Sequence, residues 1–246
     1  MTASRSPDRT DLESWAPPTE RLAVLDVPAG ALPGTVVGRR LSGPLQGFGQ
    51  MWQKTFRVRL EGADPDLTPQ GVVATWKAEF PAFWPRGNTF YAPLAGIRPG
   101  EVALLSVSAA GPVKLHTGVM VVFADEDAFT LMTPEGHMLS AWITFSAFRG
   151  EDGVIVAQAQ ALERASDPIF ETGLVLGGHR VNNRFWQGTL RNLAARLGVE
   201  AEPVTEVACV DRRRQWRYLA NVRHNSGFRS VFHTLTAPAR WVRRRP

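Results

Sequence analysis

Five histidines, one cysteine and scattered carboxylates are the residues of this sequence that suit metal binding or acid–base chemistry. No two histidines have His-x-x-x-His spacing, and the lone Cys209 excludes a Cys-x-x-Cys pair. The sequence therefore predicts no metal site and no cofactor. We expect His116 and His137 on different strands and His179 on a long helix, where a single histidine suits a proton donor or a ligand hydrogen-bond partner.

His179 and Asn183 are four residues apart, which places both on one face of a helix that is otherwise apolar there. Burying polar side chains without hydrogen bonds is costly, so this pair needs partners. A bound ligand is one candidate partner. The backbone of a neighbouring sheet and a buried water are the alternatives.

Nucleophilic catalysis finds little support in the sequence. There is no Gly-x-Ser-x-Gly motif, and Cys209 has no evident base beside it. Glu79, Glu101, Glu135 and Glu163 are isolated carboxylates. Whether the protein is an enzyme therefore stays open.

An aromatic group occupies positions 76–84, where Trp76, Phe80, Phe83 and Trp84 follow each other closely. Such residues line or gate an apolar pocket in which a few polar groups fix the orientation of a ligand. They also form ordinary core packing, and the two interpretations overlap.

The positive charge of the chain is concentrated after residue 210. The formal net charge is +5, yet residues 211–246 hold ten arginines and one acid, which leaves 18 basic and 22 acidic residues before them. The body is thus slightly acidic and the C-terminal segment strongly basic. Two clusters of this segment combine arginine with tryptophan. We predict that they form a surface that binds anions, made of Arg212, Arg213, Arg214, Trp216, Arg217, Arg240, Trp241, Arg243, Arg244 and Arg245.

Three interpretations of the basic segment remain open. Arginine with tryptophan suits anionic lipid headgroups at a membrane surface. It also suits phosphate contacts and base stacking in a nucleic acid, which we rank lower. Alternatively, the segment packs on the body as a strand or helix, because apolar residues such as Val222 and Phe232 lie between the arginines.

The composition is that of a soluble globular protein. Apolar residues make up 44% and charged residues 21% of the 246 residues. One cysteine excludes a disulfide scaffold and favours a reducing compartment. The first residues lack the apolar stretch of a secretory signal, and no apolar run approaches the roughly 20 residues of a membrane span. We therefore expect a cytoplasmic protein, with peripheral membrane contact through the basic segment left open.

The elements that position these residues follow from periodicity and turn signals. Alternating apolar residues predict a strand over 51–60, and a helix follows from the N-cap Thr68 with Pro69 to a stop at Pro81. Short turns then separate further strands, which predicts an antiparallel meander. Their ranges are 101–109, 113–123, 128–133, 137–148 and 154–165.

A long helix closes this series of elements. Asp167 and Pro168 supply an N-cap and a first-position proline, and Gly198 suits the C-terminal end. Gly177 and Gly178 within it cost about 1 kcal/mol each relative to alanine, so the pair indicates a kink or a close backbone approach.

This order of strand, helix, antiparallel strands and long helix over roughly residues 48–198 resembles the helix-grip fold of the START, birch-pollen-allergen and polyketide-cyclase superfamily. The resemblance implies an α+β fold in which a curved antiparallel sheet wraps around the C-terminal helix. Residues 1–47 would form a partly irregular N-terminal extension and 199–246 a basic C-terminal extension.

The resemblance also implies a cavity between sheet and helix that holds a hydrophobic small molecule or lipid. Our leading hypothesis is such binding without catalysis, and a cyclase or dehydratase reaction using a cavity His or Glu is the alternative. The candidate cavity residues are Trp76, Phe80, Trp84, His116, His137, Trp142, Phe145, Leu174, His179, Val181, Asn183 and Phe185.

Overall fold

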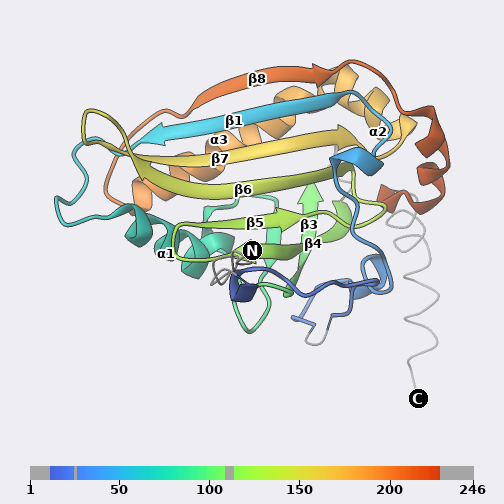
Figure 1. Cartoon of the computed structure of the whole chain (residues 1–246), viewed down its shortest axis with the longest axis horizontal. Coiled ribbons are helices and arrows are strands. Elements are labelled where there is room, and N and C mark those ends of the chain that lie inside the picture. The colour runs from blue at the N-terminus through green and yellow to red at the C-terminus, as the bar shows by residue number, and fades with distance from the viewer. Residues whose placement is uncertain (1–11, 25–26, 109–113, 228–246) are drawn as a thin grey trace, which may run out of the picture.

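One antiparallel sheet of eight strands dominates the chain. The computed structural model describes residues 12–24, 27–108 and 114–227. The strands lie in the order β2-β3-β4-β5-β6-β7-β1-β8, and every neighbouring pair is antiparallel (Figure 1). Their bounds are β1 Met51–Arg59, β2 Thr89–Tyr91, β3 Val102–Ser108, β4 Lys114–Ala124, β5 Ala128–Met132, β6 Leu139–Arg149, β7 Ile155–Ala165 and β8 Val204–Asp211.

Helix α1 (Pro69–Glu79) begins as the sequence predicts. The hydroxyl of Thr68 accepts a hydrogen bond from the amide of Gly71 at 3.0 Å, and Pro69 occupies the first helical position. A single 3₁₀ turn, Phe80–Phe83, then carries the chain past Pro81. Helix α1 thereby brings Trp76 and Phe80 onto the sheet, where both are fully buried.

The long C-terminal helix is broken near its start into α2 (Pro168–Gly173), a π turn (Leu174–Gly178) and α3 (His179–Arg196). Gly177 has a φ of 124°, which a side-chain-bearing residue rarely adopts. A Cβ on Gly178 would lie 2.9 Å from the carbonyl oxygen of Gly173. The glycine pair therefore marks both a kink and a close backbone approach.

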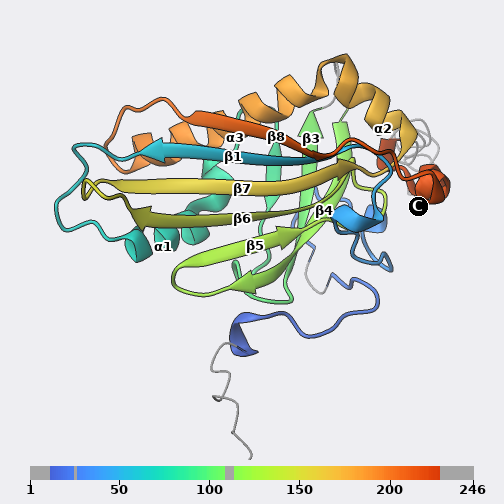
Figure 2. The ribbon, with the colours of Figure 1, turned by 45° about the horizontal axis from the view of Figure 1, so that its top comes forward.

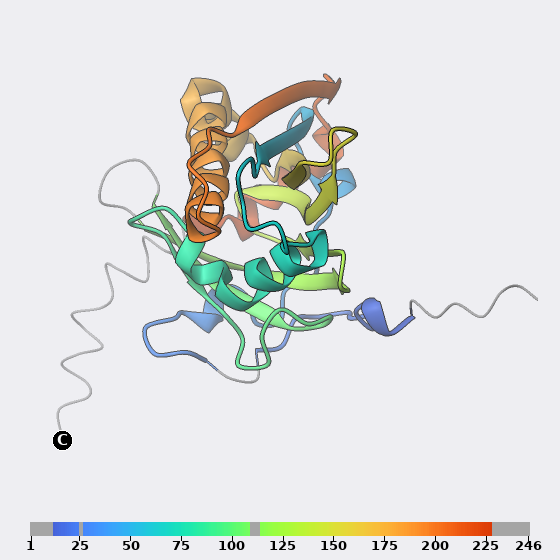
Figure 3. The same ribbon diagram turned by 90° about the vertical axis from the view of Figure 1, so that its left-hand side faces the viewer.

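Helix α3 lies across the concave face of the sheet, as the end-on view shows (Figure 3). The aromatic side chains between them form one connected group. Phe80 packs on Phe90, Phe129 and Phe145 with ring centroids 4.9–5.4 Å apart, and Phe129 stacks on Phe145 at 4.7 Å. This aromatic cluster is the centre of the core.

The N-terminal segment covers the opposite face of the sheet at β3 and β4. Leu22 and Val36 pack there against Leu104 and Met120. Gly118 permits this approach, because a Cβ on it would lie 2.9 Å from a methyl carbon of Val36. Trp15 also contacts Phe123, with ring centroids 4.8 Å apart, so the N-terminal extension already meets the sheet at this residue.

The C-terminal extension joins the sheet through its first strand. Strand β8 pairs with β1 from Met51 opposite Asp211 to Arg57 opposite Val204. A 3₁₀ segment, Trp216–His224, follows and lies beside α2 (Figure 2). Arg212, Arg213, Arg214, Trp216 and Arg217 thus belong to a segment that packs on the body, whereas Arg240, Trp241, Arg243, Arg244 and Arg245 lie outside the described residues.

Candidate functional site

The interface between α3 and the sheet has two different ends. At the C-terminal end of α3, Leu190, Leu193 and Ala194 are fully buried in the apolar core. At its N-terminal end, the helix instead directs His179 and Asn182 toward charged groups of the sheet. We call this second region the polar end of the interface.

A buried ion pair forms the centre of the polar end. Lys54 of β1 and Glu163 of β7 lie 2.7 Å apart between Nζ and Oε1, with side chains that are 0% and 2% exposed. Asn182 Nδ2 donates to both carboxylate oxygens of Glu163 at 3.1 Å. Burying such a pair offers little net stability compared with apolar side chains of similar volume.

His179 completes this polar group. Lys54 Nζ lies 3.3 Å from His179 Nδ1, and the imidazole packs on the ring of Trp52 at 4.9 Å. Burial, followed by the positive charge of Lys54, lowers the pKa of His179, while Glu163 opposes the shift. The imidazole is therefore neutral at pH 7, accepts from the ammonium at Nδ1 and carries its proton on Nε2.

Three buried polar atoms between sheet and helices have no hydrogen-bond partner within the described residues. They are Asn183 Oδ1, Trp76 Nε1 and Trp84 Nε1. A buried polar atom without a partner costs about 1–3 kcal/mol, and native proteins contain few of them. One unused acceptor and two unused donors therefore give this interior the capacity to bind a polar group.

The structure brings five predicted cavity residues together in the aromatic cluster. Trp76 packs on Phe145 with ring centroids 5.1 Å apart, and Trp84 packs on Phe185 at 5.0 Å. Phe80 contacts Trp84 at 6.3 Å and Phe145 at 5.0 Å. Because these rings contact one another, a ligand at their centre requires them to move.

Other predicted cavity residues lie elsewhere. Trp142 is 40% exposed and lies on the opposite face of the sheet from Phe145, because residues three apart on a strand alternate in direction. Val181 is 63% exposed on the outer side of α3. Leu174 lies in the π turn and is partly buried.

The two strand-region histidines are separated from the polar end. His116 of β4 pairs with Ser106 and alternates onto the face that carries Met120, which the N-terminal segment covers. His137 lies in the turn before β6, where its Nδ1 is 3.0 Å from both the amide nitrogen and the carbonyl oxygen of Leu139. Of the four predicted polar anchors, His179 and Asn183 are the two in the sheet–helix interior.

Sequence reasoning missed Lys54, Glu163 and Asn182. A signal was present in the strand over 51–60, where Lys54 shares the inward parity of Phe56 and Val58. A lysine on an apolar strand face requires a buried partner, but the partner strand is 109 residues away in the sequence. Pairing it with Glu163 needs the register of β1 against β7.

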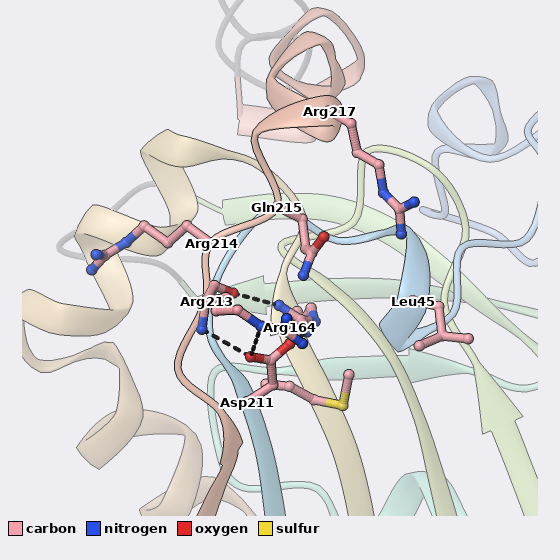
Figure 4. A pocket seen from close by; sticks show the side chains of 8 residues that line it. Leu45, Arg164, Asp211, Arg213, Arg214, Gln215 and Arg217 are labelled. Carbon is pink, nitrogen blue, oxygen red and sulfur yellow. Dashed lines mark hydrogen bonds and ion pairs between the residues drawn. The ribbon is translucent and has the colours of Figure 1, made fainter.

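An arginine-lined pocket of about 440 Å³ lies on the other side of the sheet, where β1 begins and β8 ends (Figure 4). Arg164 of β7 forms its base. Its Nη1 donates to the carbonyls of Gly49 at 2.6 Å and Arg213 at 2.9 Å, and its Nη2 donates to Asp211 at 2.6 Å. The pocket is lined by Leu45, Met51, Arg164, Asp211, Arg213, Arg214, Gln215 and Arg217.

No group of three His, Cys, Asp or Glu side chains in the described part of the chain is arranged to hold a metal ion. No helix within the same residues is long and apolar enough to cross a membrane.

No family model and no curated protein matches this sequence. Solved structures similar to it include the di-domain ARO/CYC StfQ from the steffimycin biosynthetic pathway, at 13% identity and a TM-score of 0.42, covering 61% of this chain and 53% of that one. A protein from Nitrosomonas europaea is 14% identical over 59% of this chain and 94% of its own, with a TM-score of 0.40. Ara h 8.0201 is 12% identical over 59% of this chain and 97% of its own, with a TM-score of 0.37.

The matched part of this chain thus spans about half of StfQ, and the low identities describe a likeness of fold alone. The topology of the chain itself is that of the helix-grip arrangement. A curved antiparallel sheet lies against a long C-terminal helix, with α1 between the first two strands in sequence. The predicted α+β fold class and the resemblance to the helix-grip superfamily are therefore confirmed at the level of the fold.

Proposed function

We propose that this protein binds a hydrophobic small molecule with one polar group at the polar end of the interface between α3 and the sheet. The observation that carries this proposal is the unpartnered Oδ1 of Asn183 on the same helix as His179 and Asn182, which reach the buried pair of Lys54 and Glu163. A ligand hydroxyl that donates to Asn183 would satisfy this acceptor.

The strand beneath the helix supports an apolar body for such a ligand. Ala157, Ala159 and Ala161 of β7 are small and buried on the inward face, so they fill little of the space under the helix. The aromatic cluster adjoins them through Phe145, which pairs with Ala159. Small and aromatic walls with a few converging polar groups are typical of small-molecule sites.

The broken helix supports a route into this space. The π turn separates α2 from α3 directly before His179, and π turns occur frequently at functional sites. Leu176 and Val175 of the turn are exposed apolar side chains. Movement of the turn would open the polar end without disturbing the sealed end around Leu190 and Leu193.

Binding of the neutral dye Nile red tests this proposal. Changing Asn183→Leu replaces the unused acceptor by an apolar side chain of similar volume. Nile red has no donor that could satisfy this acceptor, so we expect its affinity to rise by about fivefold when the unpaired oxygen is removed from the site. The matched control is Asn192→Leu on the same helix at the sealed end, where Asn192 Nδ2 donates to the carbonyl of Phe83 at 3.0 Å. That variant should lose stability and keep its dye affinity. Equal dye affinity in all three proteins, or no dye binding, would contradict the proposal.

A reaction in the same space is the second candidate function, and the neutral His179 beside Lys54 favours it. A neutral imidazole with its proton on Nε2 can donate a hydrogen bond to a reacting ligand oxygen, and Lys54 lies close enough to stabilise the negative charge that develops there. Conversion of a bound ligand to a product of different mass by the wild-type protein, and not by His179→Gln, would distinguish this function from binding alone.

A further inference from the structure

We propose that the arginine-lined pocket binds a phosphate monoester group, in a site separate from the polar end of the interface. Glu163 and Arg164 are neighbours on β7 and therefore point to opposite faces of the sheet. Glu163 belongs to the polar end, and Arg164 forms the base of the pocket. The proposal is independent of ligand binding between sheet and helix.

The pocket has a positive lining. Four of its eight lining residues are arginines, and Asp211 is the one acid among them. That acid is already neutralised by hydrogen bonds from Arg164 at 2.6 Å and from the side chain of Arg213 at 3.0 Å. The remaining positive charge therefore acts on whatever enters the pocket.

Hydrogen bonds of Arg164 hold the base of the pocket in place. Arg164 is 98% buried, and its bonds to Gly49, Arg213 and Asp211 tie the beginning of β1 to the segment after β8. Asp211 also accepts from the amide of Arg213 at 2.9 Å. These contacts fix the backbone that carries Gln215 and Arg217.

Arg217 and Gln215 supply the free donors. Figure 4 shows both side chains directed toward the space beside Leu45 and Arg164, whereas Arg214 extends away to bond Glu171 at 3.0 Å. Among the described residues, the guanidinium of Arg217 has one recorded contact, the ring of Tyr218 at 4.9 Å. A planar guanidinium with free donors is suited to two hydrogen bonds with a phosphate.

The surroundings of the pocket favour the headgroup of an anionic lipid as the source of the phosphate. Leu45 of the lining is exposed, and Trp216 between Gln215 and Arg217 is 69% exposed while packing edge-on against Phe48 at 5.3 Å. Exposed tryptophan and leucine beside arginines match a protein surface that meets a membrane interface. A free phosphate ester shares the same chemistry and is separated from the lipid by experiment.

The test uses the full chain with three probes. These are phosphatidylcholine vesicles that contain or lack phosphatidic acid, soluble glycerol phosphate, and single-stranded RNA. We expect binding to the phosphatidic acid vesicles, and about a tenfold loss in Arg217→Gln because hydrogen bonds to a charged group are removed. The matched control Arg98→Gln removes the same charge from an exposed arginine beside the opposite edge of the sheet, between β2 and β3, and should retain binding. Unchanged melting temperatures would verify that both variants fold.

The outcomes distinguish a lipid headgroup from a soluble ester as the source of the phosphate. Binding to vesicles alone assigns the pocket to a lipid headgroup, and binding of glycerol phosphate alone assigns it to a soluble ester, provided that Arg217→Gln weakens it and Arg98→Gln does not. Equal losses in the two variants would reveal general charge attraction and overturn the proposal. Binding to none of the probes overturns it as well, as does binding to single-stranded RNA alone, which would indicate a nucleic-acid surface instead.

Discussion

The buried pair of Lys54 and Glu163 makes one end of the interface between α3 and the sheet polar. Each would be costly to bury alone, and their mutual contact at 2.7 Å, with Asn182 on both carboxylate oxygens, offsets that cost. The same charges orient His179, because the ammonium of Lys54 faces its Nδ1. The polar end thus carries fixed dipoles next to the apolar core, which is the combination that the proposed binding of a ligand with one polar group requires.

The buried His137 leads to a prediction about the pH dependence of stability rather than about ligand binding. Burial lowers the pKa of His137 to about 4 from an ordinary value of 6.5. A lowered pKa means that the unfolded chain binds the proton first as the pH falls. Stability linked to His137 is therefore complete above about pH 6.5 and decreases as the pH falls toward 4, by roughly 3 kcal/mol in all.

The variant His137→Asn keeps an acceptor near the amide of Leu139 and does not titrate in this range. Urea unfolding at several pH values should show a smaller loss of free energy of unfolding between pH 6.5 and 4 in the variant than in the wild type. Identical pH dependence in the two proteins would show that His137 is not the group responsible.

At the scale of elements, the broken C-terminal helix is the feature that connects fold and site. Its N-cap Asp167 accepts from the amides of Ile169 and Phe170, so α2 begins firmly at the sheet. The π turn then changes the direction in which the helix presents its side chains, and His179 and Asn182 follow directly after it. An unbroken helix would place these residues at a different angle to β1 and β7.

Substituting alanine for either of two glycines of this helix should change the free energy of unfolding in opposite directions. Gly177→Ala should lower the free energy of unfolding by about 1–3 kcal/mol, because Gly177 has a φ of 124°. Gly173→Ala should raise it by about 0.5–1 kcal/mol, because Gly173 has a helical φ of −60° and its Cβ would meet no atom within 4 Å. Thermal or urea unfolding of both variants measures the difference. A stabilising Gly177→Ala would mean that the kink is not required.

Most elements of the sheet can be predicted from the sequence because they are bounded by local signals. Turns with Gly, Pro and Asp separate the strands of the meander, and Thr68 and Asp167 mark the helix starts. Neither strand β2, which has three residues, nor strand β8, which follows the long helix, has a sequence pattern that predicts it. Both depend on pairing with a distant strand, which local periodicity does not contain.

At the scale of the whole molecule, the candidate site could be predicted in part. His179 and Asn183 were identified because a polar pair stands out on an apolar helix face. Trp142, predicted to line the cavity together with Phe145, lies three residues before it on one strand and therefore faces the other side of the sheet. Lys54 and Glu163 were missed, because their contact is a property of the register between β1 and β7.

The whole chain also separates its two candidate binding regions. The polar end lies on the concave face beneath α3, and the arginine pocket lies on the other face near the start of β1. The basic residues that the structure describes around 212–217 lie at the second region, where Arg164 and Glu171 bond to this segment. The positive charge of residues 212–217 therefore lies outside the sheet–helix interior.

Native mass spectrometry of the purified full chain tests the central claim most directly, because it detects a small molecule that remains bound between sheet and helix. The account predicts a population heavier than the 27.1 kDa chain that releases a hydrophobic molecule on collisional activation. This population should decrease in Asn183→Leu and persist in Asn192→Leu. A spectrum of the bare chain alone, before and after incubation with Nile red, would contradict the claim that this interface binds a hydrophobic ligand.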